Sequence, residues 1–330
     1  MSIQQRGAII GATGLVGQKL LDGLASRGHK PKELLLGASS RSAGQTRMFH
    51  NEELTVQTVD DVLAQKPKWA IFSAGSGVSK EWAPRFVEAG CRVIDNSSCW
   101  RMEDGVPLVV PEINLDSVND SHGIIANPNC STIQLVLALR NVQQKFGIKR
   151  MVLATYQSVS GTGKEAITQL MTERMGKQAE NMAYPHPIDM NCLPVNGALD
   201  ENNDTAEEVK LREESQKIFN DPAIAVTATV VRVPVQGGHS IAANVELRQA
   251  FSLDAVKEAI SEVEGVIVQD KPEEHIYPMP RFVESKEEVF VGRIRKDVSM
   301  DNAFNCWIVA DNLLKGAATN AIQIVEGLGY

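Results

Sequence analysis

The sequence predicts an α/β protein in which a doubly wound parallel sheet is followed by an α+β domain. Three observations lead to this fold class. Short apolar segments alternate with helix-length segments over the first 130 residues, a glycine-rich turn follows the first apolar segment, and longer β-branched segments appear only later. Strands separated by helices are typical of βαβ units and a parallel sheet. At 330 residues, the chain is long enough for two domains.

The first part of the chain contains five expected strands, each a short apolar run bounded by glycine or polar residues. The segment 18–26, which follows the glycine-rich turn, has helical spacing. The strands are expected at Ala8–Ile10, Glu33–Ala38, Trp69–Phe72, Arg92–Asp95 and Gly123–Ala126.

The second part is expected to form an antiparallel sheet with helices. Its predicted strands are Met151–Tyr156, Ile224–Pro234 and Ala242–Glu246, and its predicted helices are Glu207–Phe219 and Leu253–Glu264. Residues 179–204 have little periodicity and are expected to form a long loop. Asn312–Leu328 has the pattern of an amphipathic helix that returns to the first domain. We therefore expect one domain of residues 1–129 plus 312–330 and a second of residues 130–311.

Composition excludes several classes of function. The formal net charge is -8 and no basic stripe is visible, which argues against a nucleic-acid partner. No apolar run approaches the roughly 18 residues that span a bilayer. The first residues lead directly into a strand without a signal-peptide pattern, so we expect a cytoplasmic protein.

The five cysteines include no Cys-x-x-Cys pair, and the spacing of the histidines suggests no metal site. For Cys91, Cys192 and Cys306 we expect buried, inert thiols.

The glycine-rich turn is a candidate dinucleotide site. The segment Gly11-Ala-Thr13-Gly14-Leu15-Val16-Gly17 follows a strand and opens a helix. Its glycines permit a tight turn and close approach of the backbone to a pyrophosphate, which the helix N-terminus favours. The alternative is a glycine turn with a purely structural role.

The end of the second expected strand favours NADP over NAD. An NAD site usually places a carboxylate there to bind the ribose 2′-hydroxyl. This sequence has Ser39, Arg41 and Ser42 instead, which offer a positive, hydroxyl-rich site for a 2′-phosphate. The alternative is an exposed loop arginine.

Cys130 is the candidate nucleophile. It lies between an expected strand and a helix that runs to about Phe146, so the helix N-terminus would favour its thiolate. The alternative is a buried cysteine at a helix start. His239 lies in a glycine turn between strands and is the candidate base. The alternative is a solvated turn histidine.

Further motifs follow Gly11–Gly17 along the chain. They are Phe72-Ser-Ala-Gly75, Asp95-Asn-Ser-Ser98, Leu108-Val-Val-Pro-Glu112, Asn127-Pro-Asn-Cys-Ser-Thr-Ile-Gln134, Thr155-Tyr-Gln-Ser-Val-Ser-Gly161, Val231-Arg-Val-Pro234, Gly238-His-Ser240, Val291-Gly-Arg-Ile-Arg-Lys-Asp297 and Asp311-Asn-Leu-Leu-Lys-Gly-Ala317. In this order the motifs resemble the aspartate-semialdehyde dehydrogenase family, and the resemblance extends over most of the chain.

The resemblance implies a Rossmann-type NADP-binding domain and a catalytic and dimerisation domain like that of glyceraldehyde-3-phosphate dehydrogenase. It implies NADPH-dependent reductive dephosphorylation of L-aspartyl 4-phosphate to L-aspartate 4-semialdehyde through a Cys130 thioester. This reaction serves lysine, threonine, methionine and diaminopimelate biosynthesis. It also implies a homodimer or homotetramer whose only other partners are small-molecule substrates.

The same resemblance assigns roles to individual residues. Cys130 is the implied nucleophile, His239 the general acid/base and Gln157 the residue that orients the acyl group. Arg232 is implied to bind the substrate α-carboxylate and Glu214 its amine, although Glu214 and Lys217 would otherwise be an ordinary solvated helix pair. The implied phosphate contacts are Lys217, Arg101 and Asn129, and the implied nicotinamide-side contacts are Gly161 and Asn312.

Three alternatives remain. N-acetyl-γ-glutamyl-phosphate reductase shares the architecture, but its acetylated substrate needs no partner such as Glu214. A malonyl-CoA reductase would use a thioester on a related scaffold. A non-catalytic paralogue would bind nucleotide only, and the joint presence of Cys130, Gln157, Arg232 and His239 argues against it.

Overall fold

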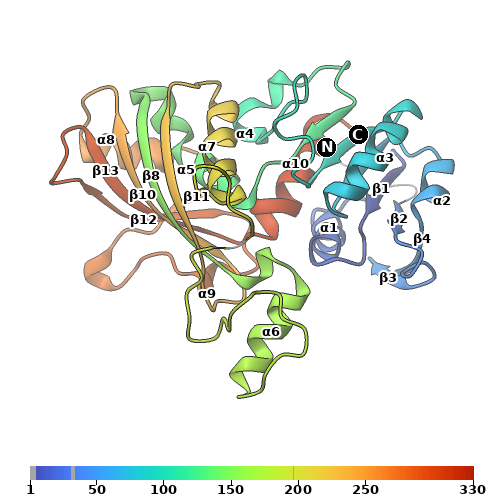
Figure 1. Ribbon diagram of the computed structural model, residues 1–330. Helices are drawn as coiled ribbons and strands as arrows, with labels where there is room; N and C mark the ends of the chain where they lie inside the picture. The colour runs from blue at the N-terminus through green and yellow to red at the C-terminus, as the bar shows by residue number, and fades with distance from the viewer. Residues whose placement is uncertain (1–4, 31–33, 196) are drawn as a thin grey trace. The chain divides into compact units, whose positions relative to one another are not determined.

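The computed structural model describes residues 5–30, 34–195 and 197–330, so Glu33 of one expected strand lies outside the described residues. The chain divides into two compact units, Met1–Asn129 with Ala317–Tyr330, and Cys130–Gly316 (Figure 1). Residues 312–316, expected with the first domain, belong to the second unit, where Asn312 hydrogen-bonds to Ser158, Ser160 and Gly238. In the described part of the chain, no helix has the length and apolar character needed to cross a membrane.

The first unit is built on a seven-stranded sheet of order β3-β4-β2-β1-β5-β6-β7. Its central strands are parallel, as expected, and only β3 pairs antiparallel. The strands are β1 Gly7–Ile10, β2 Leu34–Ala38, β3 Thr46–Phe49, β4 Glu52–Thr58, β5 Trp69–Phe72, β6 Arg92–Asp95 and β7 Ile124–Ala126.

Helices cover both faces of this sheet, which confirms the doubly wound architecture. Apolar side chains of α1 and α10 pack on one face, and those of α2 and α3 on the other. The short strands read as continuous apolar runs because both faces are buried. The helical elements are α1 Leu15–Ser26, α2 Val59–Ala64, α3 Ser76–Glu88, α4 Pro111–Asn114, η1 Leu115–Ser117 and α10 Thr319–Gly327.

The second unit contains a six-stranded sheet of order β11-β12-β13-β10-β8-β9. The expectation of an antiparallel sheet is wrong for two pairs, since β8–β9 and β11–β12 are parallel. The chain leaves the end of β8 and returns through α6, a long loop and α7, so β9 runs in the same direction as β8. The strands are β8 Ile148–Gln157, β9 Ala225–Arg232, β10 His239–Leu247, β11 Val266–Val268, β12 Val289–Lys296 and β13 Ala303–Ala310.

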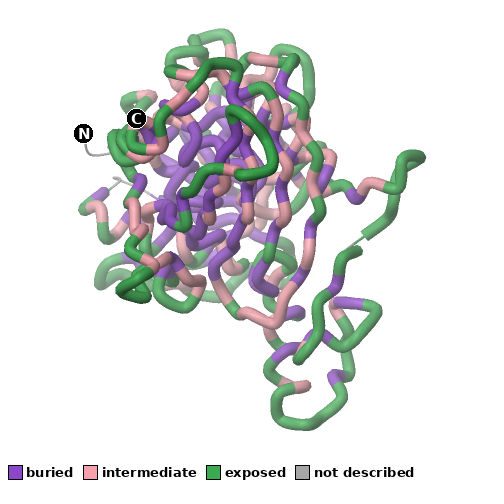
Figure 2. Tube along the Cα trace, turned by 90° about the vertical axis from the view of Figure 1, so that its left-hand side faces the viewer, coloured by how far each residue is buried: buried purple, intermediate pink, exposed green. Residues whose placement is uncertain are grey.

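One face of this sheet carries the core of the second unit. Apolar residues of α5, α7 and α8 pack on it. The segment around α6 projects from the unit (Figures 1 and 2) and has a small core of its own. The helical elements are α5 Cys130–Phe146, η2 Val159–Gly161, α6 Lys164–Arg174, α7 Ala206–Phe219, α8 Leu253–Ser261, η3 Pro272–Glu274, α9 Pro280–Val283 and the π-helical turn η4 Leu314–Ala318.

The opposite face of the sheet is less covered. On β8 the buried residues Met151, Leu153 and Thr155 alternate with Val152, Ala154 and Tyr156, which are half-buried or exposed. The same alternation continues on the neighbouring strands because the residues pair in register. We call this surface the outer sheet face and define it by Val152, Ala154, Tyr156, Thr227, Thr229, Val231, Ala242, Asn244, Asn305 and Trp307.

Candidate active site

Cys130 is the first residue of α5 and is half-buried. The N–H groups of the first helical turn point towards this end of the helix, where they favour negative charge. Gly316 approaches it closely, because a Cβ built on Gly316 would lie 2.9 Å from the Cβ of Cys130. Only glycine therefore fits opposite Cys130, the candidate nucleophile, without displacement.

Gln157 is connected to Cys130 through Ser131, the next residue in the chain. It is the last residue of β8 and is buried, and its side-chain Nε2 donates to Oγ of Ser131 at 3.0 Å. Arg232 ends the neighbouring parallel strand β9 and pairs in register with Gln157. The ends of two parallel strands thus bring the expected acyl-orienting and carboxylate-binding residues to the same sheet edge.

Arg232 and His239 converge on Gly161. A Cβ built on Gly161 would lie 2.9 Å from Nη1 of Arg232 and 2.9 Å from Nε2 of His239. Both side chains are buried, at 4% and 0% exposure. Burial, and secondarily the charge of Arg232, lower the pKa of His239 well below its ordinary value of 6.5. His239 is therefore neutral at neutral pH and is not a solvated turn histidine.

Ser158 and Asn312 form a buried network behind these two residues. The carbonyl of Ser158 accepts from Nη1 of Arg232 at 2.8 Å, while its N–H donates to Nδ1 of His239 at 3.1 Å. Oδ1 of Asn312 accepts from the N–H of Gly238 at 3.1 Å and from the hydroxyl of Ser158 at 3.0 Å. The side-chain amide of Asn312, expected on the nicotinamide side, is thus engaged in holding the turn that presents His239.

Glu214 and Lys217 lie on α7, which packs against β9 and α5. Glu214 is fully buried, whereas Lys217 in the last turn is half-buried. A carboxylate in an ordinary solvated helix pair would be exposed to water, so this interpretation is excluded for Glu214.

The other two expected phosphate contacts belong to the first unit. Arg101 is buried and its guanidinium donates to the carbonyls of Asn127 at 3.0 Å and Asn96 at 2.9 Å. Asn129, at the end of the unit, is also buried. Backbone carbonyls thus hold Arg101 in one orientation.

The glycine turn of the first unit has the geometry of a pyrophosphate site. Gly11 has φ +93°, and a Cβ there would lie 2.4 Å from the carbonyl oxygen of Ser73. A Cβ on Gly17 would meet the carbonyl oxygen of Gly11 at 2.4 Å, so helix and strand require glycine at both positions. Gly14 precedes α1 without a side-chain cap, which leaves the helix N-terminus available to an anion.

A cavity of about 670 Å³ extends from this turn. Ser39, from the end of β2, lines it, whereas Arg41 and Ser42 are exposed and half-buried in the following turn. The lining combines the glycine turn with hydroxyl side chains and apolar residues of one unit, and this combination fits a dinucleotide. Sequence analysis missed several of its lining residues, because they belong to no motif. They are Thr58, Val59, Asp60, Val78 and Trp82.

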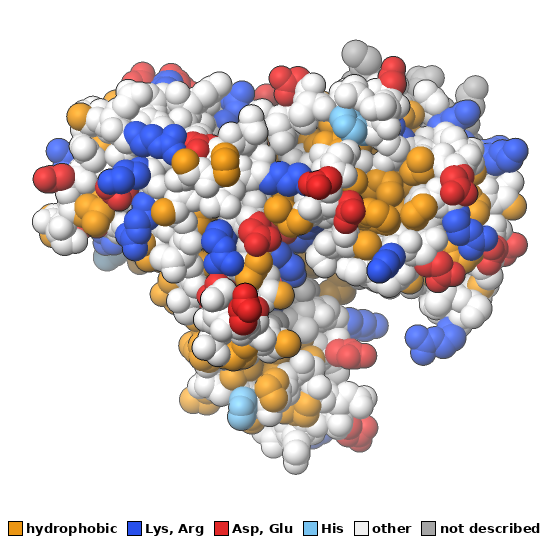
Figure 3. Space-filling model, turned by 45° about the horizontal axis from the view of Figure 1, so that its top comes forward, with side chains coloured by type: hydrophobic (Ala, Val, Ile, Leu, Met, Phe, Trp, Pro, Cys, Tyr) orange, Lys and Arg blue, Asp and Glu red, His pale blue; other side chains and the backbone are white. Residues whose placement is uncertain are grey.

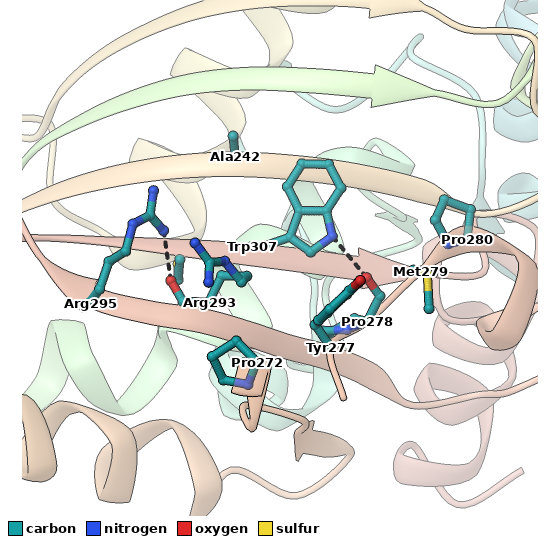
Figure 4. Close-up of a pocket in the computed structure, with 10 residues that line it drawn as sticks. Ala242, Pro272, Tyr277, Pro278, Met279, Pro280, Arg293, Arg295 and Trp307 are labelled. Carbon is teal, nitrogen blue, oxygen red and sulfur yellow. Dashed lines mark hydrogen bonds between the residues drawn. The ribbon is translucent and has the colours of Figure 1, made fainter. Parts of the chain in front are cut away.

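A second cavity of about 530 Å³ lies in the other unit, beside the outer sheet face (Figure 4). Its wall combines Tyr277 and Trp307 with the arginines of β12. Nε1 of Trp307 donates to the carbonyl of Pro278 at 3.0 Å, and Nη1 of Arg295 donates to the carbonyl of Arg293 at 2.8 Å. The ring centroids of Trp307 and Tyr156 lie 5.3 Å apart.

The remaining cysteines differ from one another. Cys91 and Cys306 are buried, as expected, and burial raises the pKa of each thiol to about 12. Cys192 is exposed, so the expectation that it is buried is wrong. It lies in the long loop between α6 and α7, which does not pack it into a core.

Comparison with known proteins decides the family. The model of "Semialdehyde dehydrogenase, NAD binding domain" matches residues 6–121, and that of "Semialdehyde dehydrogenase, dimerisation domain" matches residues 139–315. The aspartate-semialdehyde dehydrogenase of Aquifex aeolicus is 47% identical over 329 residues, covering 97% of each chain. The chain belongs to the aspartate-semialdehyde dehydrogenase family.

Other members of the aspartate-semialdehyde dehydrogenase family are similar to this chain over almost its whole length. The enzyme of Legionella pneumophila is 46% identical, covering 97% of this chain and 94% of its own. The crystal structure of aspartate semialdehyde dehydrogenase II from Vibrio cholerae complexed with ASA is 42% identical, with a TM-score of 0.94 over 99% of this chain and 98% of that one. The resemblance inferred from the motifs is confirmed.

Sequence analysis missed some residues that build this family member's site. Ser131 and Ser158 lie inside quoted motifs, but their contacts depend on the fold. Tyr184 of the long loop is buried near Arg232, and its hydroxyl donates to Thr162 at 2.8 Å. No sequence signal marks Tyr184, because a buried loop tyrosine has no periodicity.

Proposed function

We propose that this chain catalyses the NADPH-dependent reductive dephosphorylation of L-aspartyl 4-phosphate to L-aspartate 4-semialdehyde. The supporting observation is the arrangement of the second unit. Gln157 is hydrogen-bonded to the residue after Cys130, and Arg232 and His239 converge on Gly161. The printed names of the relatives support the same activity. The reaction serves lysine, threonine, methionine and diaminopimelate biosynthesis.

The substrate assignment rests on buried charges. Arg232 is buried, and its Nε has no hydrogen-bond partner in the described structure. A planar guanidinium matches a carboxylate, so Arg232 is assigned to the substrate α-carboxylate. Glu214 is buried and is assigned to the α-amine. An N-acetylated substrate has no cationic amine for Glu214, which favours aspartyl phosphate over the glutamate analogue.

The first chemical step uses Cys130. Its thiolate attacks the acyl carbon, a C–S bond forms, and the C–O bond to phosphate breaks with the electron pair leaving on phosphate. Arg101, Asn129 and Lys217 are assigned to the departing phosphate. Gln157 is assigned to the orientation of the acyl group, because its amide is held beside the helix start by Ser131.

A bound nicotinamide cofactor supplies the hydride that reduces the Cys130 thioester. The resulting oxyanion gains negative charge, and the neutral His239 is assigned to its stabilisation. Collapse of this oxyanion restores the carbonyl and expels the Cys130 thiolate, so the aldehyde forms without a further reactant.

The cofactor is assigned as NADP. Gly11, Thr13, Gly14, Leu15 and Val16 are assigned to the pyrophosphate. Ser39, Arg41 and Ser42 are assigned to the 2′-phosphate, because no carboxylate ends β2 and Arg41 is exposed in the following turn. Gly161 and Asn312 remain assigned to the nicotinamide side.

The active assembly is proposed to be a homodimer or homotetramer. The outer sheet face is the proposed self-association surface, and its apolar and aromatic members include Ala154, Tyr156 and Trp307. An uncovered sheet face with apolar side chains is suited to burial against another sheet. The matched dimerisation-domain model spans the whole of this face.

Substrate comparison tests the proposed function. We expect phosphate-dependent reduction of NADP with L-aspartate 4-semialdehyde, and no detectable rate with N-acetyl-L-glutamate 5-semialdehyde. Glu214→Gln should raise the KM for aspartate semialdehyde by about 10-fold or more, since it removes a charged hydrogen bond. The proposal fails if the N-acetylated aldehyde is preferred, or if neither aldehyde is oxidised while NADPH binds normally.

A further inference from the structure

The two ring nitrogens of His239 have different surroundings. Nδ1 lies 3.1 Å from the backbone nitrogen of Ser158 and 3.0 Å from its hydroxyl oxygen. Nε2 is buried and has no hydrogen-bond partner in the described structure. It is the nitrogen nearest to Gly161. One nitrogen is therefore engaged with the protein and the other remains available for the reaction.

The contact with Ser158 defines which nitrogen carries hydrogen. A backbone N–H can only donate, so Nδ1 must present its lone pair to Ser158. A hydrogen on Nδ1 would face the amide hydrogen across this contact. A neutral imidazole has a single N–H group, which must then lie on Nε2. Burial lowers the pKa of His239, so the doubly protonated ring is also disfavoured.

Ser158 is itself held from three sides. Its carbonyl accepts from Arg232 at 2.8 Å, and its hydroxyl lies 3.0 Å from Oδ1 of Asn312 and 3.0 Å from Oγ of Ser160. The same Asn312 oxygen accepts from the N–H of Gly238, the residue before His239. The network thus fixes the amide and the imidazole relative to one another.

We propose that the main-chain N–H of Ser158 is a positioning group that holds His239 as its Nε2–H tautomer. In this state His239 enters the reaction as a hydrogen-bond donor at Nε2 and not as a base at that atom. This inference rests on the proposed function for its role in catalysis. The oxyanion formed on the Cys130 adduct would accept from Nε2–H. Full transfer of that proton would leave an imidazolate anion, so His239 stabilises the oxyanion by hydrogen bonding while the proton stays on nitrogen.

The backbone of Ser158 offers a selective test. Its φ is −66° and ψ 154°, the region that a proline ring imposes. The preceding Gln157 is the last residue of β8, so it has the extended backbone that a following proline requires. Ser158→Pro therefore removes the N–H donor and the hydroxyl, whereas the matched variant Ser158→Ala removes the hydroxyl alone. Both keep the carbonyl that accepts from Arg232.

The measurement is ¹⁵N NMR of histidine-labelled protein without substrate, with the His239 signals assigned by their loss in His239→Gln. We expect an unprotonated Nδ1 and a protonated Nε2 in the wild type and in Ser158→Ala, with no titration as the pH falls through 6.5. Ser158→Pro should give a mixture of tautomers and lower kcat about 10-fold or more with little change in KM.

An Nδ1–H tautomer or a charged imidazolium in the wild type at pH 7 would overturn the proposal. Unchanged His239 signals in Ser158→Pro would also overturn it. If Ser158→Pro does not fold, the wild-type spectrum still decides the tautomer. Because the spectrum needs no turnover, an Nε2–H signal in a protein inactive on aspartate semialdehyde would reject the proposed function and leave the tautomer assignment standing.

Discussion

At the residue scale, close approach of the backbone constrains the candidate catalytic side chains. Gly316 lies against Cys130, and Gly161 lies against both Arg232 and His239. Glycine has no Cβ, so the backbone can come within contact distance of neighbouring atoms that a side chain would displace. Two glycines far apart in the chain thus leave room for Cys130, for the guanidinium of Arg232 and for the imidazole of His239.

Gly161→Ala tests this arrangement. The new Cβ would lie 2.9 Å from both Nη1 of Arg232 and Nε2 of His239, so both side chains must move. We expect kcat/KM to fall at least about 10-fold, because small displacements of reacting groups are costly. Gly237→Ala is the control, since its Cβ would meet Glu284 no closer than 3.6 Å. Equal kinetics for the two variants would show that this contact does not constrain the site.

At the scale of secondary structure, the ends of parallel strands bring candidate site residues together. Gln157 and Arg232 are paired residues at the ends of β8 and β9, and they meet only because these strands are parallel. The first unit follows the same rule, with its cavity beside the carboxyl ends of β1 and β2. Ligands of open α/β sheets bind at such strand ends.

The turn after β2 contains Arg41, whose assigned contact with the 2′-phosphate can be tested by substitution. Arg41→Ala should raise the KM for NADPH about 5- to 10-fold, because a charged hydrogen bond to the 2′-phosphate is lost. The KM for NADH, which lacks this phosphate, should stay within about a factor of two, because no hydrogen bond to it is lost. Steady-state kinetics with both cofactors distinguish this from a general loss of binding. Equal changes for NADPH and NADH would contradict the assignment of Arg41.

The sequence predicted most accurately those strands whose residues are apolar and buried on both faces of the sheet. The expected β5 and β6 match the structure at every residue, since both are short runs buried on both faces. The β3–β4 hairpin was missed because its side chains are mostly polar and few of them are buried. Strand β12 was not expected, because its motif ends in charged residues. Strand β13 was not expected either, although most of its residues are apolar and buried. The helix expected at 312–328 begins as a π-helical turn and becomes α-helical only at Thr319.

Candidate site residues that act through their side chains were easier to predict from the sequence than those that act through backbone N–H and carbonyl groups. Cys130, Arg232 and His239 could be selected from the sequence because reactive and charged residue types stand out within motifs. The contribution of Ser158 comes from its N–H and carbonyl, which every non-proline residue has. Its role depends on how closely the end of β8 lies to the start of β10, and a sequence motif does not predict this distance.

At the scale of the whole molecule, the distribution of charged and apolar side chains over the surface is relevant to self-association. Over the face in Figure 3, acidic and basic side chains are interspersed and form no continuous basic stripe among the described residues. The outer sheet face is different, since Ala154, Tyr156 and Trp307 bring apolar area to the surface of the second unit. Such a surface is suited to self-association.

Ala154→Arg tests the role of this face. A buried, unpaired arginine would be costly in a sheet-to-sheet contact, so the variant should be mainly monomeric at micromolar concentration. Val298→Arg is the control, because Val298 is fully exposed in the turn between β12 and β13. Sedimentation velocity measures both. An Ala154→Arg protein that sediments like the wild type would place the interface elsewhere.

The central claim is that Cys130 carries the acyl group, and a single burst experiment tests it. Wild-type protein is mixed with L-aspartate 4-semialdehyde and NADP without phosphate, and NADPH is followed while the intact protein is analysed by mass spectrometry. We predict a burst of one NADPH per site and one hydroxylamine-sensitive acyl group on the peptide that contains Cys130. Cys130→Ser should show neither, whereas Cys192→Ser, which removes an exposed thiol, should show both. A full burst in Cys130→Ser, or an acyl group on another residue, would contradict the account.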